Sequence, residues 1–120
     1  MSGLEPSYDP IVVELDSGRA VVATSREWLA GQFVEIFIRR RGYWTELDDG
    51  GEAIRRAGKP EGWLEAADQI AAAEGMNVGR NGVVGVKYGE RTGHDLDEIT
   101  GRLADTARAI YLTLLDLSEE

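Results

Sequence analysis

The sequence predicts an α+β fold in which an antiparallel sheet built from hairpins is packed by two amphipathic helices, including a long C-terminal helix. Two observations lead to this prediction. Short alternating or β-branched runs are separated by glycine-containing turns, as expected for hairpins. Two later segments, 61–74 and 96–117, repeat their apolar residues every three or four positions, which is the spacing of a helix with one buried face.

The length and composition are those of one ordinary globular domain. The chain has 120 residues, of which 42% are hydrophobic and 29% charged, enough for one modest core. We expect a single domain over residues 1–120, with 1–9 as a flexible tail. The chain contains no cysteine, which excludes disulfides and thiolate zinc sites. No signal peptide and no run of about 20 apolar residues is visible, so we expect a cytoplasmic protein without membrane contact.

The fold is organised around the stretch 33–58, FVEIFIRRRGYWTELDDGGEAIRRAG. Its first part, 33–39, alternates between apolar and mixed positions and predicts a strand with two unlike faces. A turn is expected at 40–42, because glycine at its end adopts a positive φ easily. Residues 43–47 then predict a second strand. The apolar face of the first strand consists of Val34, Ile36 and Ile38.

The motif Asp48-Asp49-Gly50-Gly51 is expected to form a structural corner between this hairpin and a short helix that begins near Glu52. The first amides of a helix have no partner within the helix, and the two carboxylates are placed to accept hydrogen bonds from them. The alternative is a metal or acid–base site, since paired carboxylates also serve those purposes. The spacing does not match a calcium loop, so the structural role is favoured and no metal or cofactor is predicted.

The residues before this stretch predict one further hairpin. Segments 11–14 and 20–24 are β-branched runs on either side of Asp16-Ser17-Gly18. Segment 25–31 remains open between a single helical turn and a loop that covers the sheet. Trp28 within it is expected to anchor the core, because buried tryptophans contribute a large contact area.

Two helices and a hairpin follow the corner. The helix over 61–74 ends at Gly75, and a hairpin is expected from 76–78 and 83–88 around the turn 79–82. Asp95 and Glu98 resemble a capping box at the start of the last helix. Its apolar seam predicts a helix across the sheet, and with Tyr111 and Leu115 beside it the seam could also form a homodimer. The seam residues are Leu96, Ile99, Leu103, Ala107, Ile110, Leu114 and Leu117.

The net charge of −9 is the strongest global signal, and it is unevenly distributed. Residues 1–60 hold ten acids and eight bases, whereas 61–120 hold twelve acids and five bases. Such a surface repels nucleic acid and membrane phosphates and favours a basic protein partner, although charge also serves solubility alone. The expected partner-binding residues lie on the exposed faces of the later helices: Glu61, Glu65, Asp68, Glu74, Asp97, Asp105 and Asp116.

Other candidate chemistry is weak. His94 is the only histidine, so a catalytic triad or histidine metal site is not predicted. The three arginines at 39–41, with Tyr43 and Trp44, could bind single-stranded nucleic acid through charge and stacking. The net charge opposes this alternative, and direct nucleic-acid binding is not expected.

The stretch 21–58 resembles an uncharacterised domain family, number 1828 among the domains of unknown function, which is found in bacteria and their phages. The motif Leu47-Asp48-Asp49-Gly50-Gly51, between a strand and a short helix, carries most of the resemblance. Gly31-Gln32 stands where the family leads us to expect an acidic residue, so no catalytic acidic pair is carried over. The resemblance implies a fold and a phage or mobile-element setting, without an established activity.

These observations favour a small acidic protein that is not an enzyme and binds a basic partner. In a phage setting that partner is expected to be a host defence complex whose nucleic-acid-binding surface the protein occludes, as an anti-CRISPR-like inhibitor and nucleic-acid mimic. The alternatives are an immunity protein against a basic toxin nuclease, and a metal-dependent enzyme or nuclease accessory that uses Asp48 and Asp49.

Overall fold

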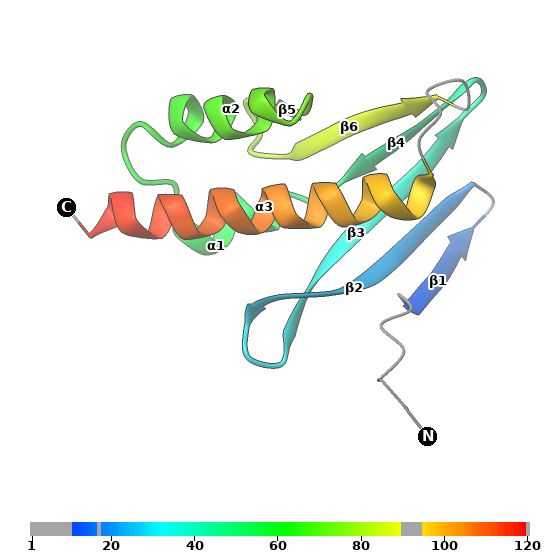
Figure 1. Ribbon diagram of the computed structural model, residues 1–120, viewed down its shortest axis with the longest axis horizontal. Coiled ribbons are helices and arrows are strands. Elements are labelled where there is room, and N and C mark those ends of the chain that lie inside the picture. Colours follow the sequence, from blue (N-terminus) through cyan, green and yellow to red (C-terminus); the bar gives the residue numbers. More distant parts are fainter. Residues whose placement is uncertain (1–10, 17, 90–94, 120) are drawn as a thin grey trace.

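The computed structural model describes residues 11–16, 18–89 and 95–119, and they form the predicted α+β fold (Figure 1). Six strands make one antiparallel sheet in the order β1-β2-β3-β4-β6-β5. The predicted tail at 1–9 and His94 lie outside the described residues. The strands are β1 (Ile11–Asp16), β2 (Arg19–Leu29), β3 (Gln32–Arg41), β4 (Trp44–Asp48), β5 (Asn77–Val78) and β6 (Val84–Gly89); the helices are α1 (Glu52–Ala57), α2 (Trp63–Ala73) and α3 (Leu96–Ser118).

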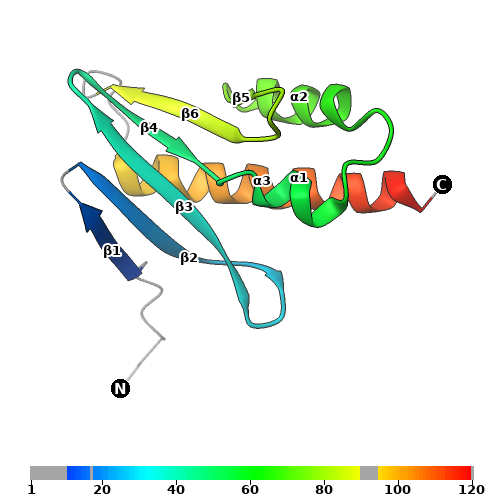
Figure 2. The ribbon, with the colours of Figure 1, turned by 180° about the vertical axis from the view of Figure 1, so that it is seen from behind.

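The alternation predicted for the central strand is confirmed. Val34 and Ile36 are fully buried, while Phe33 and Phe37 on the other face of β3 are 46% and 37% exposed. Successive side chains of a strand point to opposite faces, so one face of the sheet packs against the core and the other does not. Helix α3 lies across the packed face, and its C-terminal half extends beyond the strands beside α1 and α2 (Figures 1 and 2).

The segment 25–31 is neither a helical turn nor a covering loop, because β2 continues to Leu29. Its pairing with β3 shifts register between Ala23 and Glu27 and again before Leu29. At this irregularity the Thr24 hydroxyl donates to the Val34 carbonyl oxygen (2.8 Å) and accepts from the Arg26 N–H (3.2 Å). These bonds satisfy polar groups where the regular ladder is interrupted, which is why the strand persists.

The hairpin turn between β3 and β4 falls later than expected. Arg40 and Arg41 belong to β3, and the turn consists of Gly42 and Tyr43, with Arg41 opposite Trp44. Gly42 has a φ of 67°, as a two-residue hairpin turn of this kind requires. Because the turn is shorter, Arg40 and Arg41 both belong to β3. Successive residues of a strand point to opposite faces of the sheet, so these two arginines lie on opposite faces.

The long C-terminal helix closes the core as predicted. Asp95 is its N-cap, and its side chain accepts a hydrogen bond from the Asp97 N–H (3.0 Å). Tyr111 is only 5% exposed and packs edge-on against Trp28, with ring centroids 5.4 Å apart. Tyr111 is therefore part of the core and is not available to a second copy of the chain. Within the described residues, no helix has the length and apolar character needed to span a bilayer.

The buried seam of α3 predicts a large stability difference between two leucines of the same helix. Leu103 is fully buried, whereas Leu112 is 41% exposed. Leu103→Ala is expected to lower the free energy of unfolding by about 2–5 kcal/mol, because it removes packed methyl groups and leaves a cavity. Leu112→Ala should change it by less than about 1 kcal/mol. Urea denaturation of both variants measures the difference, and equal losses would contradict the orientation of α3.

Candidate functional site

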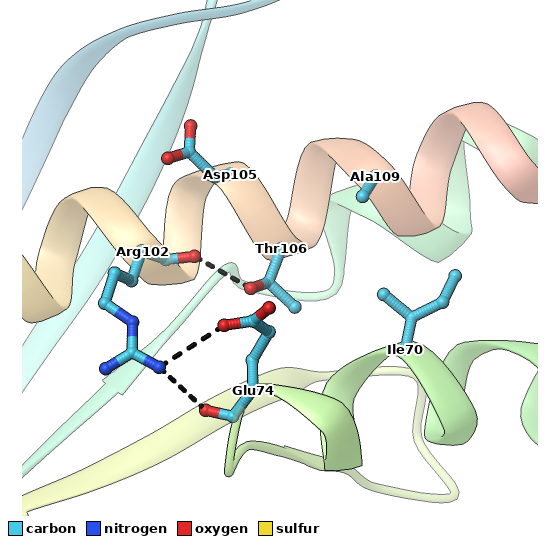
Figure 3. Close-up of a pocket in the computed structure, with 6 residues that line it drawn as sticks. All are labelled: Ile70, Glu74, Arg102, Asp105, Thr106 and Ala109. Atoms are coloured by element: carbon cyan, nitrogen blue, oxygen red, sulfur yellow. Dashed lines mark hydrogen bonds and ion pairs between the residues drawn. The ribbon is translucent and has the colours of Figure 1, made fainter.

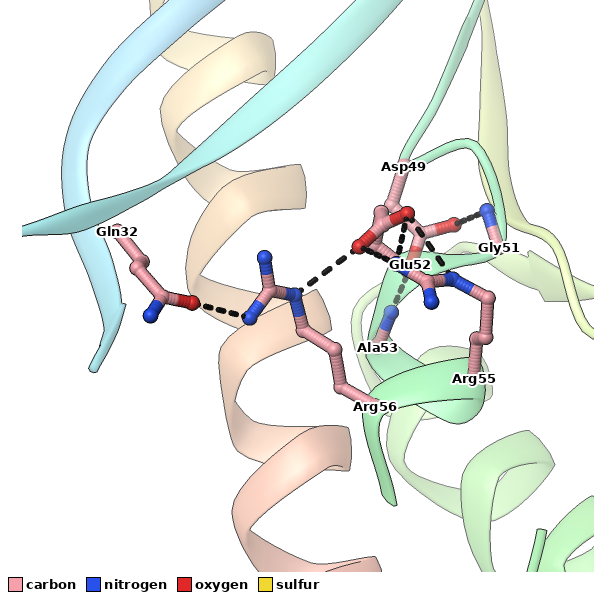
Figure 4. Close-up of polar contacts among 7 residues, drawn as sticks. All are labelled: Gln32, Asp49, Gly51, Glu52, Ala53, Arg55 and Arg56. Atoms are coloured by element: carbon pink, nitrogen blue, oxygen red, sulfur yellow. Dashed lines mark hydrogen bonds and ion pairs between the residues drawn. The ribbon is translucent and has the colours of Figure 1, made fainter. Parts of the chain in front are cut away.

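A buried carboxylate, Asp49, joins three elements at the corner after β4 (Figure 4). Its Oδ1 accepts hydrogen bonds from the backbone N–H groups of Gly51 (2.8 Å) and Val84 (3.0 Å), and its Oδ2 accepts one from Ala53 (3.0 Å). The Asp49 N–H donates to the Val84 carbonyl oxygen (3.0 Å). Asp49 is fully buried, and its bonds from Ala53 and Val84 are buried with it, while the bond from Gly51 is partly buried. One side chain therefore ties the end of β4 to the start of α1 and to β6.

The geometry of this corner does not favour metal binding or acid–base chemistry. Burial raises the pKa of Asp49, although the backbone amides of Val84, Ala53 and Gly51 oppose the change by stabilising the ionised form. Both of its oxygens already face N–H donors. Asp48 belongs to the open face of the sheet and accepts a hydrogen bond from Gly50 N–H (2.8 Å). Nowhere in the described ranges do three histidine or acidic side chains converge as a metal site requires.

Glu52 links the corner helix to the hairpin between β2 and β3. Its carboxylate binds Arg55 (2.6 Å) and Arg56 (3.0 Å), and Arg56 also donates to the Gln32 side-chain oxygen (2.7 Å). The Arg56 guanidinium lies 5.5 Å from the centre of the Trp28 ring. Partial burial acts to raise the pKa of Glu52, but the hydrogen bonds and charges of Arg55 and then Arg56 outweigh it and lower the pKa.

Substitution of Asp49 is expected to lower the stability of the fold. Asp49→Asn keeps one acceptor oxygen but turns an amide N–H₂ toward the backbone donors, and should lower the free energy of unfolding by about 1–3 kcal/mol. Asp49→Ala leaves the buried N–H groups of Ala53 and Val84 and the partly buried N–H of Gly51 without this acceptor, and should cost more. Asp48→Asn is the matched control, because the half-buried side chain keeps an acceptor for Gly50. Thermal unfolding measures all three, and a neutral Asp49→Ala would contradict this role.

The lowered pKa of Glu52 predicts a pH-dependent contribution to stability. A carboxylate whose pKa is lower in the folded than in the unfolded chain stabilises the fold above its unfolded pKa, near 4.5. That contribution is lost as the pH falls through the folded value. The stability gap between the wild type and Glu52→Gln should therefore be largest at neutral pH, at roughly 1 kcal/mol or less, and close below pH 4.5. Denaturant titrations of both proteins at several pH values measure it, and a pH-independent gap would contradict the ion pairs.

The predicted acidic residues do not form a single cluster. Glu61, Glu65 and Asp68 are exposed at and just before the first turns of α2. Asp97 and Asp116 are exposed at opposite ends of α3, separated by roughly 28 Å at the usual helical rise. The side chains of these five residues form no ion pair with the described part of the chain. The acidic surface is thus a helical layer rich in carboxylates, three of which lie at the start of α2.

Glu74 and Asp105 are instead held by arginines. Asp105 pairs with Arg26 of β2 (2.9 Å), and Glu74 pairs with Arg102 of α3 (3.3 Å). Both acids line a groove of about 240 Å³ between α2 and α3, with Ile70 and Ala109 on its apolar side (Figure 3). Each of these two acids already faces an arginine, so Glu74 and Asp105 are weaker candidates for a basic partner than the five unpaired acids.

A second surface was only partly visible in the sequence. The sequence indicates a possible binding surface at 39–44 through its arginines and aromatic rings. The structure adds Lys87 to this surface, because its Nζ lies 5.3 Å from the centre of the Trp44 ring. Lys87 was missed because the strand containing it could not be placed beside β4 from local patterns. The sequence predicts a strand over 83–88, but the pairing of β6 with β4 is a long-range contact.

Comparison with known proteins gives no further identification. No protein-family model matches the chain, and neither curated proteins nor solved structures provide a match. The resemblance to the uncharacterised bacterial and phage domain family therefore remains an expectation from the motif at the corner.

Proposed function

We propose that this protein is a small non-enzymatic binding protein that places the acidic part of its helical layer against a basic surface of another protein. The observation that carries the proposal is the separation of charge between the two layers. The helical segments 49–75 and 95–119 hold twelve acids and five bases, whereas 11–48 and 76–89 hold six acids and seven bases. The excess negative charge of the described chain therefore belongs to the helical side.

The row at the start of α2 is the best-defined part of this surface. Glu65 and Asp68 are three positions apart, so their side chains lie on the same side of the helix, and both are exposed. Like charges at this spacing destabilise a helix by a few tenths of a kcal/mol. A basic partner would relieve that repulsion and would be steered to the surface by its field. Glu61 extends the row before the helix begins.

The partner that fits such a surface is a protein whose own basic face normally binds nucleic acid. In the phage setting implied by the sequence resemblance, an anti-CRISPR-like inhibitor of a host defence complex is the first form of this proposal. The second form is an immunity protein against a basic toxin nuclease, which would bind through the same attraction between acidic and basic surfaces. Genes adjacent to this one distinguish them, because an immunity gene lies beside its toxin. The occupied oxygens of Asp49 weigh against the third, metal-dependent form.

Charge reversal on α2 tests the proposal. Affinity capture from nuclease-treated bacterial lysate should recover a basic protein, and the purified partner is then titrated against wild type and the double variant E65K/D68K at low and moderate salt. The double variant should fold normally, because both positions are exposed, and should bind at least tenfold more weakly, mainly through slower association. Wild-type affinity should fall as salt rises.

A matched control separates this surface from net charge. Glu65→Lys and Glu35→Lys change the same residue type by the same charge, but Glu35 lies on β3 in the other layer. Only Glu65→Lys should weaken binding. Equal affinities for wild type, Glu65→Lys and the double variant, with the same salt dependence, would show that the acidic layer is only solvated surface.

A further inference from the structure

One face of the sheet is covered by no helix within the described residues. Figure 2 shows this side, with β3 crossing in front of α3. Large apolar side chains remain exposed here, including Phe37 on β3 and Trp44 on β4, which is 42% exposed. Tyr43 in the adjoining turn is 94% exposed. A strand face with several exposed aromatic rings is unusual for a surface that contacts only water.

The strand register gathers cations at the end of this face that lies next to the Gly42-Tyr43 turn. Arg39 of β3 lies opposite Glu46 of β4, which lies opposite Lys87 of β6. In the next row along the strands, Arg41 lies opposite Trp44. Neighbouring strands are about 4.8 Å apart, so the cationic groups flank the Trp44 ring on both sides.

The contacts within these rows leave the cations available to a ligand. Lys87 lies over the Trp44 ring, and its side chain is exposed. Among the described residues, the one ion pair of Arg41 is a long contact with Glu46 (3.6 Å), and its side chain is 49% exposed. Arg39 is exposed and forms no ion pair with the residues described here. Glu46, between Arg39 and Lys87, is half-buried, and the half-buried Asp48 on the same face also attracts Arg39.

We propose that this end of the open sheet face, formed by Arg39, Arg41, Tyr43, Trp44 and Lys87, binds single-stranded nucleic acid. Charge complementarity argues for phosphate, and the exposed rings argue for unpaired bases, because a base stacks on an aromatic side chain whatever its sequence. A duplex hides those base faces within its stack, so it could not make the same stacking contacts. The expectation of no nucleic-acid contact relied on the net charge, which the fold places on the opposite layer.

Fluorescence anisotropy with labelled single-stranded 20-mers of thymidine and of uridine tests this site on the full chain. The wild type should bind with an affinity that falls with salt, at a slope of log K against log[salt] of about −2 for three phosphate contacts. Trp44→Ala and Tyr43→Ala should each weaken binding about tenfold. Arg39→Glu should weaken it as well and reduce the slope by about 0.7. A duplex of equal length should compete poorly.

Arg80→Glu is the matched charge control, because Arg80 is exposed in the turn between β5 and β6, at the other end of β6. It should bind within twofold of wild type. Tyr43→Ala keeps the test valid if Trp44→Ala is unstable, since an almost fully exposed side chain contributes nothing to the core. The proposal is overturned if the wild type shows no saturable binding, or if the Tyr43 and Arg39 variants bind as the wild type does. Sedimentation showing a dimer that Trp44→Ala dissociates, without oligonucleotide binding, would assign the face to a second copy instead.

Discussion

The hydrogen bonds accepted by the Asp49 carboxylate hold the sheet and the helices together. This buried group accepts hydrogen bonds from the N–H of Ala53 at the start of α1 and from the N–H of Val84 in β6, which lies 35 positions after Asp49 in the chain. The adjoining Gly50 has a φ of 68°, and a Cβ there would lie 2.6 Å from the Phe37 ring, so the corner requires glycine. Because the chain turns here and β6 binds the same carboxylate, β6 pairs with β4 and the sheet acquires its observed order.

The orientation fixed at this corner also separates the charges. Once α1 leaves the sheet at Glu52, the later helices lie on one face, and the twelve acids of the helical segments accumulate there. The strands carry five arginines and Lys87, and their open face is left with aromatic rings and cations. A protein of net charge −9 thereby presents two unlike surfaces, and the net value alone describes neither of them.

The two proposed binding surfaces differ in the forces on which they depend. The acidic layer acts through a broad field that steers a basic protein, so affinity there should respond to salt and to charge reversal on α2. The open end of the sheet acts through local stacking beside phosphate contacts, so single aromatic substitutions should matter most. In the groove between α2 and α3, Asp105 pairs with Arg26 and Glu74 pairs with Arg102. These ion pairs connect elements of the fold.

The sequence alone determined the parts of this protein that depend on neighbouring residues. Alternation over 33–39 gave both faces of β3, the repeated seam gave α3, and the motif at 48–51 gave the corner, because each pattern reflects a local backbone period or turn. Tertiary structure decided the continuation of β2 through 25–29, where the bonds of Thr24 replace the ladder, and the shorter turn after Arg41. It alone decided that Asp105 meets Arg26, 79 positions away, and that Lys87 lies beside Trp44. Such pairs depend on which strands and helices become neighbours, which no local period specifies.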